Sequence, residues 1–521
     1  MSGVWLGRSV RAVSGIGVVA LVAAVVAGGI RTPAPQAPPV HEGTVVTVPP
    51  SAVALTCPAP LILPEGGGDK AFDPTPVAPV MTLVAAAASS AGGAVTPAAG
   101  GAAVATLSPG TSAARVNGPG GALVVSARPT DTAAQLSAAV GSVVTAGDLR
   151  GLSAASCQRP TTDAWLVGGA TDLSSTAQLV IAAAGATPAE VTVSVYGPAG
   201  KVDLSADHYL VAPGAQRVVN LAAIAPEQRR VVVRVRATGG AVTTYVQDTK
   251  LDGFTPRGSD LVAPGSAPGK HQVVPGLSVV AAAVDSPLAG ALRLMVPGRT
   301  GTTAHVRLLG PDGPQELPGG EQVELAPGEV TDIPLGGLPA GSYTAVVDSP
   351  RPVVAAGQVA RAGAPTTLDP APSLERAWVA SSPRGLDGIV TVPGGTRGTL
   401  VVGAVGTSGS ASGTLRLIGT DGRLLAERPL TVPAGSTGTW LTDTLVGTGP
   451  VVPGTQGKAV PGSAVAAVQL VPDEGAAQLA WALVADVARP DGTLISVLAP
   501  VPADDGDAQV TVRQDPRVGT P

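Results

Sequence analysis

A short phrase that occurs three times constrains this chain more than any other feature. Each copy is a run of alternating apolar and polar residues that ends in a glycine-led turn, and the turn glycines are Gly197, Gly310 and Gly419. The copies are therefore about 110 residues apart, which is the length of one β-sandwich domain. Two further landmarks follow each copy in the same order: a strand end before a Pro/Gly turn, and two β-rich segments expected to form a hairpin.

The three copies also share the phase of their alternation. The residues between the apolar positions are mostly polar, so one face of each strand is expected in a core and the other in water. The apolar positions, two and four residues before each turn glycine, are Val193 and Val195, Val306 and Leu308, and Leu415 and Leu417. The sequence therefore predicts an all-β protein with three tandem Ig-like or fibronectin-like β-sandwich repeats, over residues 161–258, 259–372 and 373–490.

An apolar run near the N-terminus predicts a membrane segment. Residues 12–30 contain Ser14 as their only polar side chain, and a helix of this length is about 28 Å long, close to the hydrocarbon thickness of a bilayer. Arg8 and Arg11 precede the run, which favours a cytoplasmic N-terminus. We therefore expect a signal anchor, a transmembrane helix in contact with the lipid bilayer, over residues 1–31.

The same run has two other readings. A cleaved secretory signal fits the small residues at 25–27. A buried core helix is disfavoured, because a Pro-rich tether follows directly over residues 32–50. The anchor predicts a single-pass protein of the cell membrane whose C-terminal portion lies outside the cytoplasm. The cleaved signal predicts a secreted protein.

Two cysteines bound the next region, residues 51–160, which we expect to be an N-terminal β region. In an exported chain an even number of cysteines favours a disulfide, so Cys57 and Cys157 are predicted to form one. The bond would close a loop of about 100 residues, which is worth about 4.7 kcal/mol in the chain-entropy model. The alternative is a pair of buried thiols. Within this region residues 85–121 are rich in Ala and Gly and close to low complexity, and a short helix is expected near 132–140.

No catalytic or metal-binding motif accompanies these features. The sequence lacks G-x-S-x-G, H-E-x-x-H, P-loop and G-x-G-x-x-G patterns, and its four histidines are far apart. A net charge of −5, without a basic run, argues against nucleic acid as a partner. We therefore predict no enzyme activity, no catalytic residues, no cofactor and no metal site. Residues 491–521 are expected to be a C-terminal tail.

Aromatic residues make up only 2% of the chain, so each tryptophan is informative. Trp165 and Trp378 each open a repeat, where a large ring is typical of a core or of a wedge between domains. Trp440 and Trp481 both lie in the third repeat. They are the candidate binding residues, because sugar sites stack tryptophan or tyrosine rings on the ligand.

Several short motifs along the chain carry a family resemblance. They are the N-terminal anchor, the Cys57-Pro58 pair, the segment from Cys157 into Trp165–Gly169, and the turns after Val195 and Leu308. In these features the chain resembles an uncharacterised, exported and membrane-anchored family of high-GC Gram-positive bacteria, known only as a domain of unknown function. No activity is established for that family, so the resemblance implies no catalytic residues.

Together these observations favour a non-catalytic extracytoplasmic protein of the cell envelope. Its role would be that of a scaffold, or of a binding protein for a cell-wall protein or glycan. An envelope hydrolase with an active site between repeats is the alternative from another class, and it requires carboxylates or a Ser/His pair that converge in a deep cleft. A carbohydrate-binding module is the third reading, and it requires exposed, coplanar aromatic rings.

Overall fold

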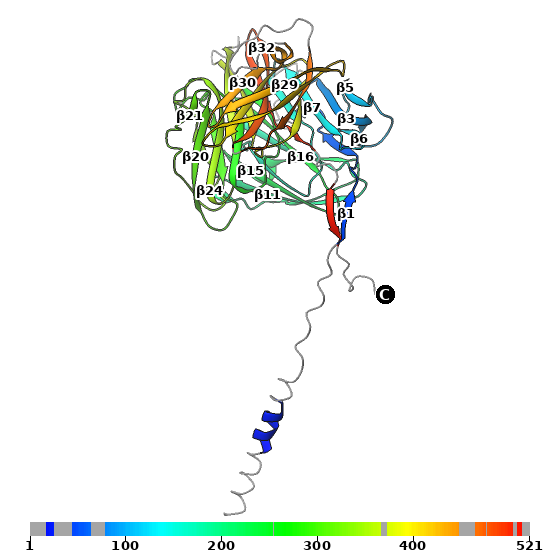
Figure 1. Ribbon diagram of the computed structural model, residues 1–521. Coiled ribbons are helices and arrows are strands. Elements are labelled where there is room, and N and C mark those ends of the chain that lie inside the picture. Colours follow the sequence, from blue (N-terminus) through cyan, green and yellow to red (C-terminus); the bar gives the residue numbers. More distant parts are fainter. Residues whose placement is uncertain are drawn as a thin grey trace, which may run out of the picture. The chain divides into compact units, whose positions relative to one another are not determined.

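A computed structural model of the 521-residue chain gives the fold. Two units are distinguished, one formed by residues 1–49 with 507–521 and the other by residues 50–506. The regular secondary structure of the larger unit is almost entirely β-strand (Figure 1). The residues that the structure describes are 17–25, 44–63, 79–253, 255–365, 372–447, 464–475, 477–503 and 508–512.

The described residues of the smaller unit form one helical stretch and one strand pair. Residues 17–25 are helical, and β1 (Thr44–Val48) pairs antiparallel with β35 (Ala508–Val512). Within the described residues, no helix has the length and apolar character needed to cross a membrane. Both ends of the predicted segment 12–30, and most of the predicted tether, lie outside the described residues.

The first part of the larger unit is a sheet with the strand order β2-β6-β3-β7-β8, to which β4 and β5 add by pairing with β3. The long strand β3 changes register near Ser89 and Ser90. Its first half therefore pairs with β5 and β7, and its second half pairs with β4 and β6. The strands are β2 (Val53–Cys57), β3 (Met81–Pro97), β4 (Ala105–Leu107), β5 (Gly110–Asn117), β6 (Leu123–Pro129), β7 (Gln135–Val144) and β8 (Gly151–Ser156).

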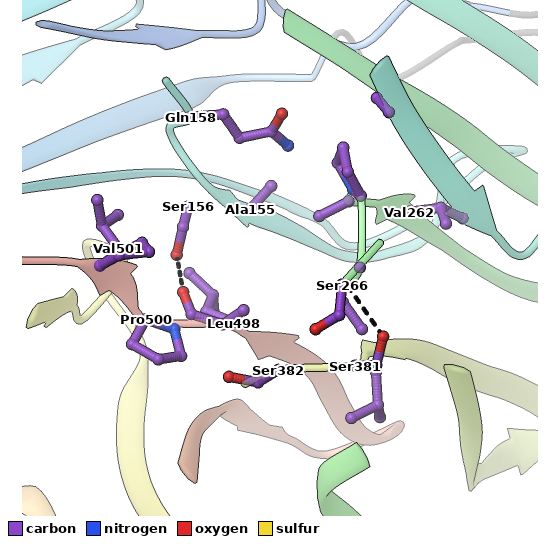
Figure 2. Close-up of a pocket in the computed structure, with 18 of the residues that line it drawn as sticks. Ala155, Ser156, Gln158, Val262, Ser266, Ser381, Ser382, Leu498, Pro500 and Val501 are labelled. Carbon is purple, nitrogen blue, oxygen red and sulfur yellow. Dashed lines mark hydrogen bonds between the residues drawn. The ribbon is translucent and has the colours of Figure 1, made fainter. Parts of the chain in front are cut away.

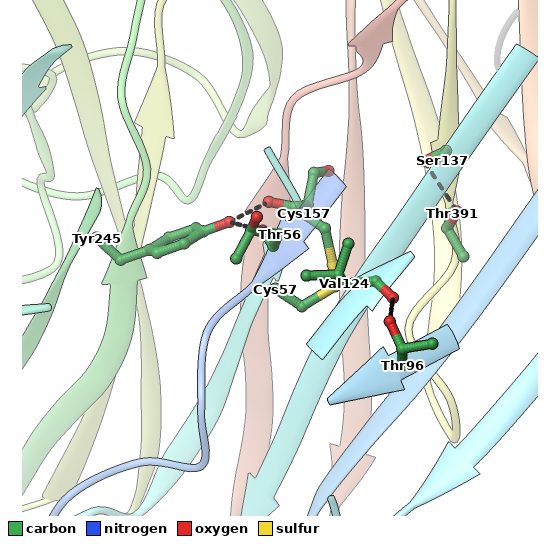
Figure 3. Close-up of a disulfide and its surroundings, with 9 residues drawn as sticks. Thr56, Cys57, Thr96, Val124, Ser137, Cys157, Tyr245 and Thr391 are labelled. Atoms are coloured by element: carbon green, nitrogen blue, oxygen red, sulfur yellow. Dashed lines mark hydrogen bonds between the residues drawn. A yellow bond between two sulfur atoms is a disulfide. The ribbon is translucent and has the colours of Figure 1, made fainter. Parts of the chain in front are cut away.

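The two ends of this sheet meet, so that it forms a small closed barrel. Thr56 in β2 and Gln158 after β8 exchange two backbone hydrogen bonds, of 2.7 and 3.0 Å. Cys57 and Cys157, the next residues along, form the predicted disulfide, with their Cα atoms 4.4 Å apart (Figure 3). That spacing is typical of directly opposed residues in an antiparallel pair. The disulfide therefore fastens the seam of the barrel.

One expectation for this region is wrong, since the expected helix near 132–140 is largely strand β7. The Ala-rich segment is β-structure, as the expected β region implies. A barrel of few strands has little interior space, so alanine suits its inward positions better than a large side chain. Alanines 85, 87, 127, 134 and 138 are all completely buried in this core.

The remaining chain contains the same pairing pattern three times. In strand order along each segment, one sheet pairs the first strand with the sixth, the sixth with the third, and the third with the fourth. The other sheet pairs the fifth strand with the second, the second with the seventh, and the seventh with the eighth. The six apolar positions of the repeated phrase are all buried, as their phase predicts.

The bounds of these strands follow. The first segment contains β9 (Asp163–Val167), β10 (Ser175–Ala182), β11 (Ala189–Gly197), β12 (Gly200–Lys201), β13 (His208–Val211), β14 (Gln216–Asn220), the short helix α2 (Leu221–Ile224), β15 (Val232–Thr238), β16 (Thr243–Asp252) and β17 (Thr255–Val262). The second contains β18 (Gly269–Val279), β19 (Ala291–Met295), β20 (Thr302–Gly310), β21 (Gly313–Gln315), β22 (Val323–Leu325), β23 (Thr331–Pro334), β24 (Gly341–Pro365) and β25 (Pro372–Ala380). The third contains β26 (Gly388–Thr391), β27 (Arg397–Val405), β28 (Ser410–Gly419), β29 (Leu424–Pro433), β30 (Thr437–Leu441), the 3-10 helix η1 (Thr442–Val446), β31 (Val465–Pro472), β32 (Gln478–Arg489), β33 (Gly492–Leu498) and β34 (Val501–Pro502). In the numbering of eight strands per segment, β12 with β13 and β21 with β22 each count as one fourth strand, because both pieces pair with the third strand. The strand β24 supplies both the sixth and the seventh strand of the second segment, and β34 is not counted.

The third landmark is not a hairpin, contrary to expectation. In each segment the sixth and seventh strands belong to opposite sheets, as β15 and β16 do. In the second segment both are parts of β24, whose residues 344–348 pair with β20 and whose residues 354–358 pair with β19. Figure 1 shows β24 beside β20. An immunoglobulin sandwich instead groups its first strand with the second and its seventh with the third and sixth. The first and seventh strands have thus exchanged sheets here.

Each segment ends in an eighth strand that the predicted boundaries leave out or cut. These strands are β17, β25 and β33, whereas the predicted repeats end at residues 258, 372 and 490. The first of these boundaries falls inside a paired strand, since β17 pairs directly with β16. The predicted tail from residue 491 likewise begins with a fully paired strand, β33.

Neighbouring segments are joined by hydrogen bonds, and the last segment contacts the N-terminal barrel. The chain of contacts is therefore closed. The donors and acceptors are Tyr245 Oη to the Ser156 carbonyl (3.1 Å), Arg293 Nη1 to the Gly169 carbonyl (2.8 Å), Thr437 Oγ1 to the Leu309 carbonyl (2.7 Å), and Thr391 Oγ1 with Ser137 Oγ (2.9 Å).

Candidate functional site

Four strands from four parts of the chain pack against one another in the interior of the larger unit. They are β8 of the barrel and the eighth strands β17, β25 and β33, each of which contacts two others in the cyclic order β8, β17, β25, β33. We call these four strands the central bundle. Two hydrogen bonds join β8 to β33 and the residues that follow it: Ser496 Oγ donates to the Ala154 carbonyl, and Ser156 Oγ donates to the Ala499 carbonyl. The residue number increases along both partners, from 154 to 156 and from 496 to 499. The bundle strands β8 and β33 therefore run in the same direction.

A fully buried carboxyl group, that of Asp260 in β17, joins three of the four strands. Its Oδ2 accepts a hydrogen bond of 2.8 Å from the backbone N–H of Trp378 in β25. Its Oδ1 lies 2.8 Å from Ser496 Oγ in β33. Burial raises the pKa of Asp260 to about 8, because desolvation outweighs the opposing hydrogen bonds from the Trp378 backbone and Ser496.

The geometry around Ser496 fits a protonated Asp260. Ser496 Oγ lies 3.1 Å from the Ala154 carbonyl as well as 2.8 Å from Asp260 Oδ1, yet a hydroxyl has one proton to donate. The Ser496 hydroxyl can therefore donate to Asp260 Oδ1 or to the Ala154 carbonyl. When Asp260 is protonated, its carboxyl group can donate to Ser496 Oγ while Ser496 donates to Ala154, so both contacts are then hydrogen bonds. Asp260 thus links β17, β25, β33 and, through Ser496, β8.

Glu375 in β25 is a second buried carboxyl group in the bundle. Its Oε1 accepts hydrogen bonds from the backbone N–H groups of Leu152 in β8, at 2.8 Å, and of Ile495 in β33, at 3.5 Å. Burial raises the pKa of Glu375 well above its usual range, and the hydrogen bond from Leu152 opposes this only in part. Like Asp260, Glu375 uses one side chain to connect three strands.

Close backbone approach at Gly151 makes this contact possible. A Cβ atom at Gly151 would lie 2.8 Å from the Ser259 carbonyl oxygen and 3.2 Å from Glu375 Oε1. Real Cβ atoms do not come so close to a backbone oxygen, so only glycine fits between β8 and β17 at this level.

Trp378 connects the bundle to the first segment. Its ring lies in the core of that segment, and its Nε1 donates to Asp248 Oδ2 at 2.9 Å. Arg376 also donates to Asp248 Oδ2, at 3.2 Å, and the guanidinium of Arg293 lies 4.9 Å from the centre of the ring. Trp378 is thus a wedge between segments, one of the two roles expected for it.

A pocket of about 410 Å³ lies at the carboxyl ends of the four bundle strands (Figure 2). Most of its wall is apolar, and Leu498, Pro500, Val501 and Val262 are examples that Figure 2 labels. Neither Asp260 nor Glu375 lines it. The buried carboxyl groups therefore hold strands together beneath the pocket and do not face its interior.

The charged groups at this pocket are engaged elsewhere. They are Arg159 and Asp163. Arg159 Nη2 donates to the Pro502 carbonyl at 3.1 Å, and Asp163 forms two hydrogen bonds with Arg234, of 3.0 and 2.6 Å. The pocket therefore offers hydrogen-bonding and apolar surface in place of a free charge. Elsewhere too, no three His, Cys, Asp or Glu side chains in the described parts of the chain gather as a metal site requires.

The residues singled out from the sequence are not brought together. Cys57 and Cys157 form the barrel seam, and Cys157 also lines the pocket. Trp440 and Trp481 lie in the core of the third segment, with exposed fractions of 3% and 0%. Their burial counts against a role in stacking on a sugar, because that role requires an exposed ring face, and a binding function for them remains a prediction.

The bundle residues were missed, although the sequence holds a signal for them. Asp260 directly precedes the apolar Leu261-Val262, and Glu375 lies three residues before Trp378, so each carboxylate lies close to a short apolar stretch where burial would require hydrogen-bond partners. A second signal is that every bundle strand is followed within four residues by a proline. These prolines are Pro160, Pro264, Pro383 and Pro500.

The fold and this site define a class: an all-β protein of several sheets, stapled by one disulfide and joined through a buried bundle with a pocket at its end. Residues 108–440 match the model of a family of unknown function (DUF5719), and the chain belongs to that family. The match extends from β5 to β30 and so includes β8, β17 and β25. No curated protein and no solved structure matches the sequence.

Proposed function

We propose that this chain is a non-catalytic, extracytoplasmic protein of the cell envelope that acts as a rigid scaffold or binding protein for a cell-wall protein or glycan. Its three eight-stranded segments are tandem sandwich repeats, related to Ig-like domains but with the first and seventh strands exchanged. A single-pass N-terminal helix, or a secretory signal, brings the protein outside the cytoplasm.

The observation that carries the scaffold role is the central bundle. In tandem domains that fold independently, the eighth strand of each domain would contact only its own domain. Here the eighth strands β17, β25 and β33 pack in one bundle with β8 of the barrel. Buried polar contacts such as those of Asp260 and Glu375 are costly unless the partner strands are all in place. Such an arrangement favours one fixed geometry for the four domains, as a scaffold needs.

Two observations support a location outside the cytoplasm. The Cys57–Cys157 disulfide is typical of oxidising compartments. The apolar run at residues 12–30 has the length of a membrane span. The two observations support each other, because an export signal would bring the barrel into a compartment where its disulfide can form.

The hydrolase alternative receives less support. Its active site would need carboxylates that reach a cleft, but the two carboxyl groups that meet in the interior are fully buried and do not line the pocket. Asp163, which does line it, is held by Arg234. The non-catalytic proposal therefore accounts for these groups as structural links.

Protease accessibility on intact protoplasts tests the topology. A C-terminal epitope on the full-length chain should be lost on protease treatment, while a cytoplasmic marker protein survives. Alkylation of unreduced protein should leave Cys57 and Cys157 unmodified. Protection of the epitope, with only a short N-terminal piece digested, would show that the orientation is wrong.

Incubation of the purified full-length chain with cell-wall preparations tests the absence of catalysis. We expect no release of soluble sugars or peptides over time, and co-sedimentation with the wall where the partner is a wall glycan. Release of soluble fragments at a rate proportional to protein concentration would instead make the chain an envelope hydrolase.

A further inference from the structure

The pocket at the end of the central bundle carries an inference that does not depend on the proposed location or scaffold role. It lies where four separate chain segments end, beyond β8, β17, β25 and β33. Its volume of about 410 Å³ is in the range of small-molecule sites, which are about 300–1,000 Å³ and are often formed at domain interfaces.

Three polar atoms in its wall have no hydrogen-bond partner among the described residues. They are Gln158 Nε2, Ser266 Oγ and Ser382 Oγ. Buried polar groups in folded proteins are nearly always satisfied, so three such atoms around one cavity call for an explanation. Ser382 is the strongest case, because only 4% of the residue is exposed.

Each of these three residues follows a different strand of the central bundle, and together they line the pocket from several sides. Gln158 follows β8, Ser266 follows β17, and Ser382 follows β25, while Leu498, Pro500 and Val501 of the remaining segment line another side (Figure 2). Neighbouring polar groups are already paired: Ser156 Oγ donates to the Ala499 carbonyl at 2.7 Å, and Ser381 Oγ accepts from the Ser266 backbone N–H at 3.0 Å. The unpaired atoms therefore differ from their neighbours in lacking a protein partner.

The side chains that line the pocket restrict the chemical class of ligand that it can bind. The unpaired groups are an amide N–H₂ and two hydroxyls, so each has a proton to donate to an oxygen acceptor. The charged lining residues already have partners, so a charged ligand would lose its hydration without compensation. Most of the remaining wall is aliphatic or proline and suits an apolar body.

We propose that this pocket is a binding site for an uncharged, predominantly apolar small molecule that carries one or more oxygen acceptors. The ligand's acceptors receive hydrogen bonds from Ser382, Ser266 and Gln158, and its apolar body packs against Leu498, Val262 and the prolines of the wall. A ligand held there contacts all four segments that end at the bundle, so its binding stabilises their association.

Titration of the full-length chain with Prodan tests this site. Prodan is an uncharged naphthalene with one ketone oxygen, and its emission shifts to the blue in an apolar environment. We expect saturable one-site binding. Anilinonaphthalene sulfonate, a similarly sized anion, should bind at least about ten-fold more weakly, because the pocket has no free cation to pair with it.

Substitutions in the pocket wall test whether Prodan binds at this site. Ala499→Phe fills the pocket from its wall and should weaken Prodan binding by at least about ten-fold. Ser382→Ala removes one donor and should weaken it roughly five-fold. Ala206→Phe is the matched control, because Ala206 is exposed on the first segment and does not line this pocket, so binding should match the wild type.

Near-ultraviolet circular dichroism of each variant reports whether it folds. If Ala499→Phe does not fold, Ser382→Ala decides alone, because it only removes an atom. Unchanged Prodan affinity in the folded Ala499→Phe variant, or in Ser382→Ala when that variant decides, would overturn the assignment. Tighter binding of the anion than of Prodan would also overturn it, because the ligand would then not be an uncharged molecule.

Discussion

Replacing Asp260 by asparagine should make the protein more stable at neutral and alkaline pH. The folded protein raises the pKa of this carboxyl group from 3.8 to about 8. Between these two values the folded state retains a proton that the unfolded state has released. Stability therefore falls as the pH rises through this window, and the contribution present below pH 4 is lost above pH 8.

The size of the effect follows from the two pKa values. Each pH unit in the window costs about 1.4 kcal/mol, and the window is about four units wide, so Asp260 lowers the free energy of unfolding by about 5 kcal/mol at pH 8 relative to pH 4. Asparagine resembles the protonated carboxyl group. Its Oδ1 can accept from the Trp378 N–H, and its amide can donate to Ser496 Oγ, which keeps the network of the bundle intact.

Urea unfolding at pH 5, 6, 7, 8 and 9, followed by tryptophan fluorescence, measures this effect. We expect the variant and the wild type to be closest in stability at pH 5 and the variant to gain with each pH unit up to about pH 8. Asp312→Asn is the matched control, because Asp312 is exposed in a turn. A stability difference between Asp260→Asn and the wild type that does not change with pH would refute the reasoning.

Three further predictions follow from the barrel and the bundle. The double variant Cys57→Ala/Cys157→Ala should lose about 3–5 kcal/mol of stability, because the disulfide closes a loop with a sequence separation of 100, and reduced wild-type protein should melt at the same temperature as the variant; a loss below about 1 kcal/mol would contradict this. Tyr245→Phe should destabilise the protein by about 1–2 kcal/mol in urea unfolding, because its hydroxyl lies at the barrel seam between the Ser156 and Thr56 carbonyls, at 3.1 and 3.3 Å, and donates its one proton to this pair of acceptors; unchanged stability would count against that role. Gly151→Ala should lower the melting temperature clearly, because its Cβ would meet the Ser259 carbonyl, whereas Gly120→Ala, where a Cβ meets nothing, should not; equal effects of the two would argue against the close packing of β8 and β17.

The sequence predicts the parts of this fold that depend on local pattern. Period-two alternation located the buried residues of the third strand in each segment, such as Val195 and Leu308, because a strand has only two faces. The cysteine pair also predicted its bond, since two cysteines that become oxidised within one chain have one way to pair.

What the sequence did not predict depends on contacts between distant segments. Nothing local to β15 and β16 reveals that they lie in opposite sheets, because both read as alternating strands. The Ala-rich β3 gave no individual strand prediction because alanine contributes little hydrophobic signal, yet alanine suits the interior of a narrow barrel. Asp260 and Glu375 acquire their roles only when β8, β17, β25 and β33 meet, and no spacing along the chain encodes that meeting.

The central bundle also sets the order in which this chain is able to finish folding. Ser156 in β8 cannot form its hydrogen bond to Ala499 until 343 further residues have been synthesised, and the bond from Arg150 to Asp491 requires 341 further residues. Contacts of such long range form slowly. While the ribosome is still adding the third segment, the barrel and the first two segments expose unpaired strand surface where β33 belongs. The nascent chain is thus open to mispairing until β33, the fourth strand of the bundle, has been synthesised, and a chaperone that shields strand edges during synthesis or export would act on this protein at that stage.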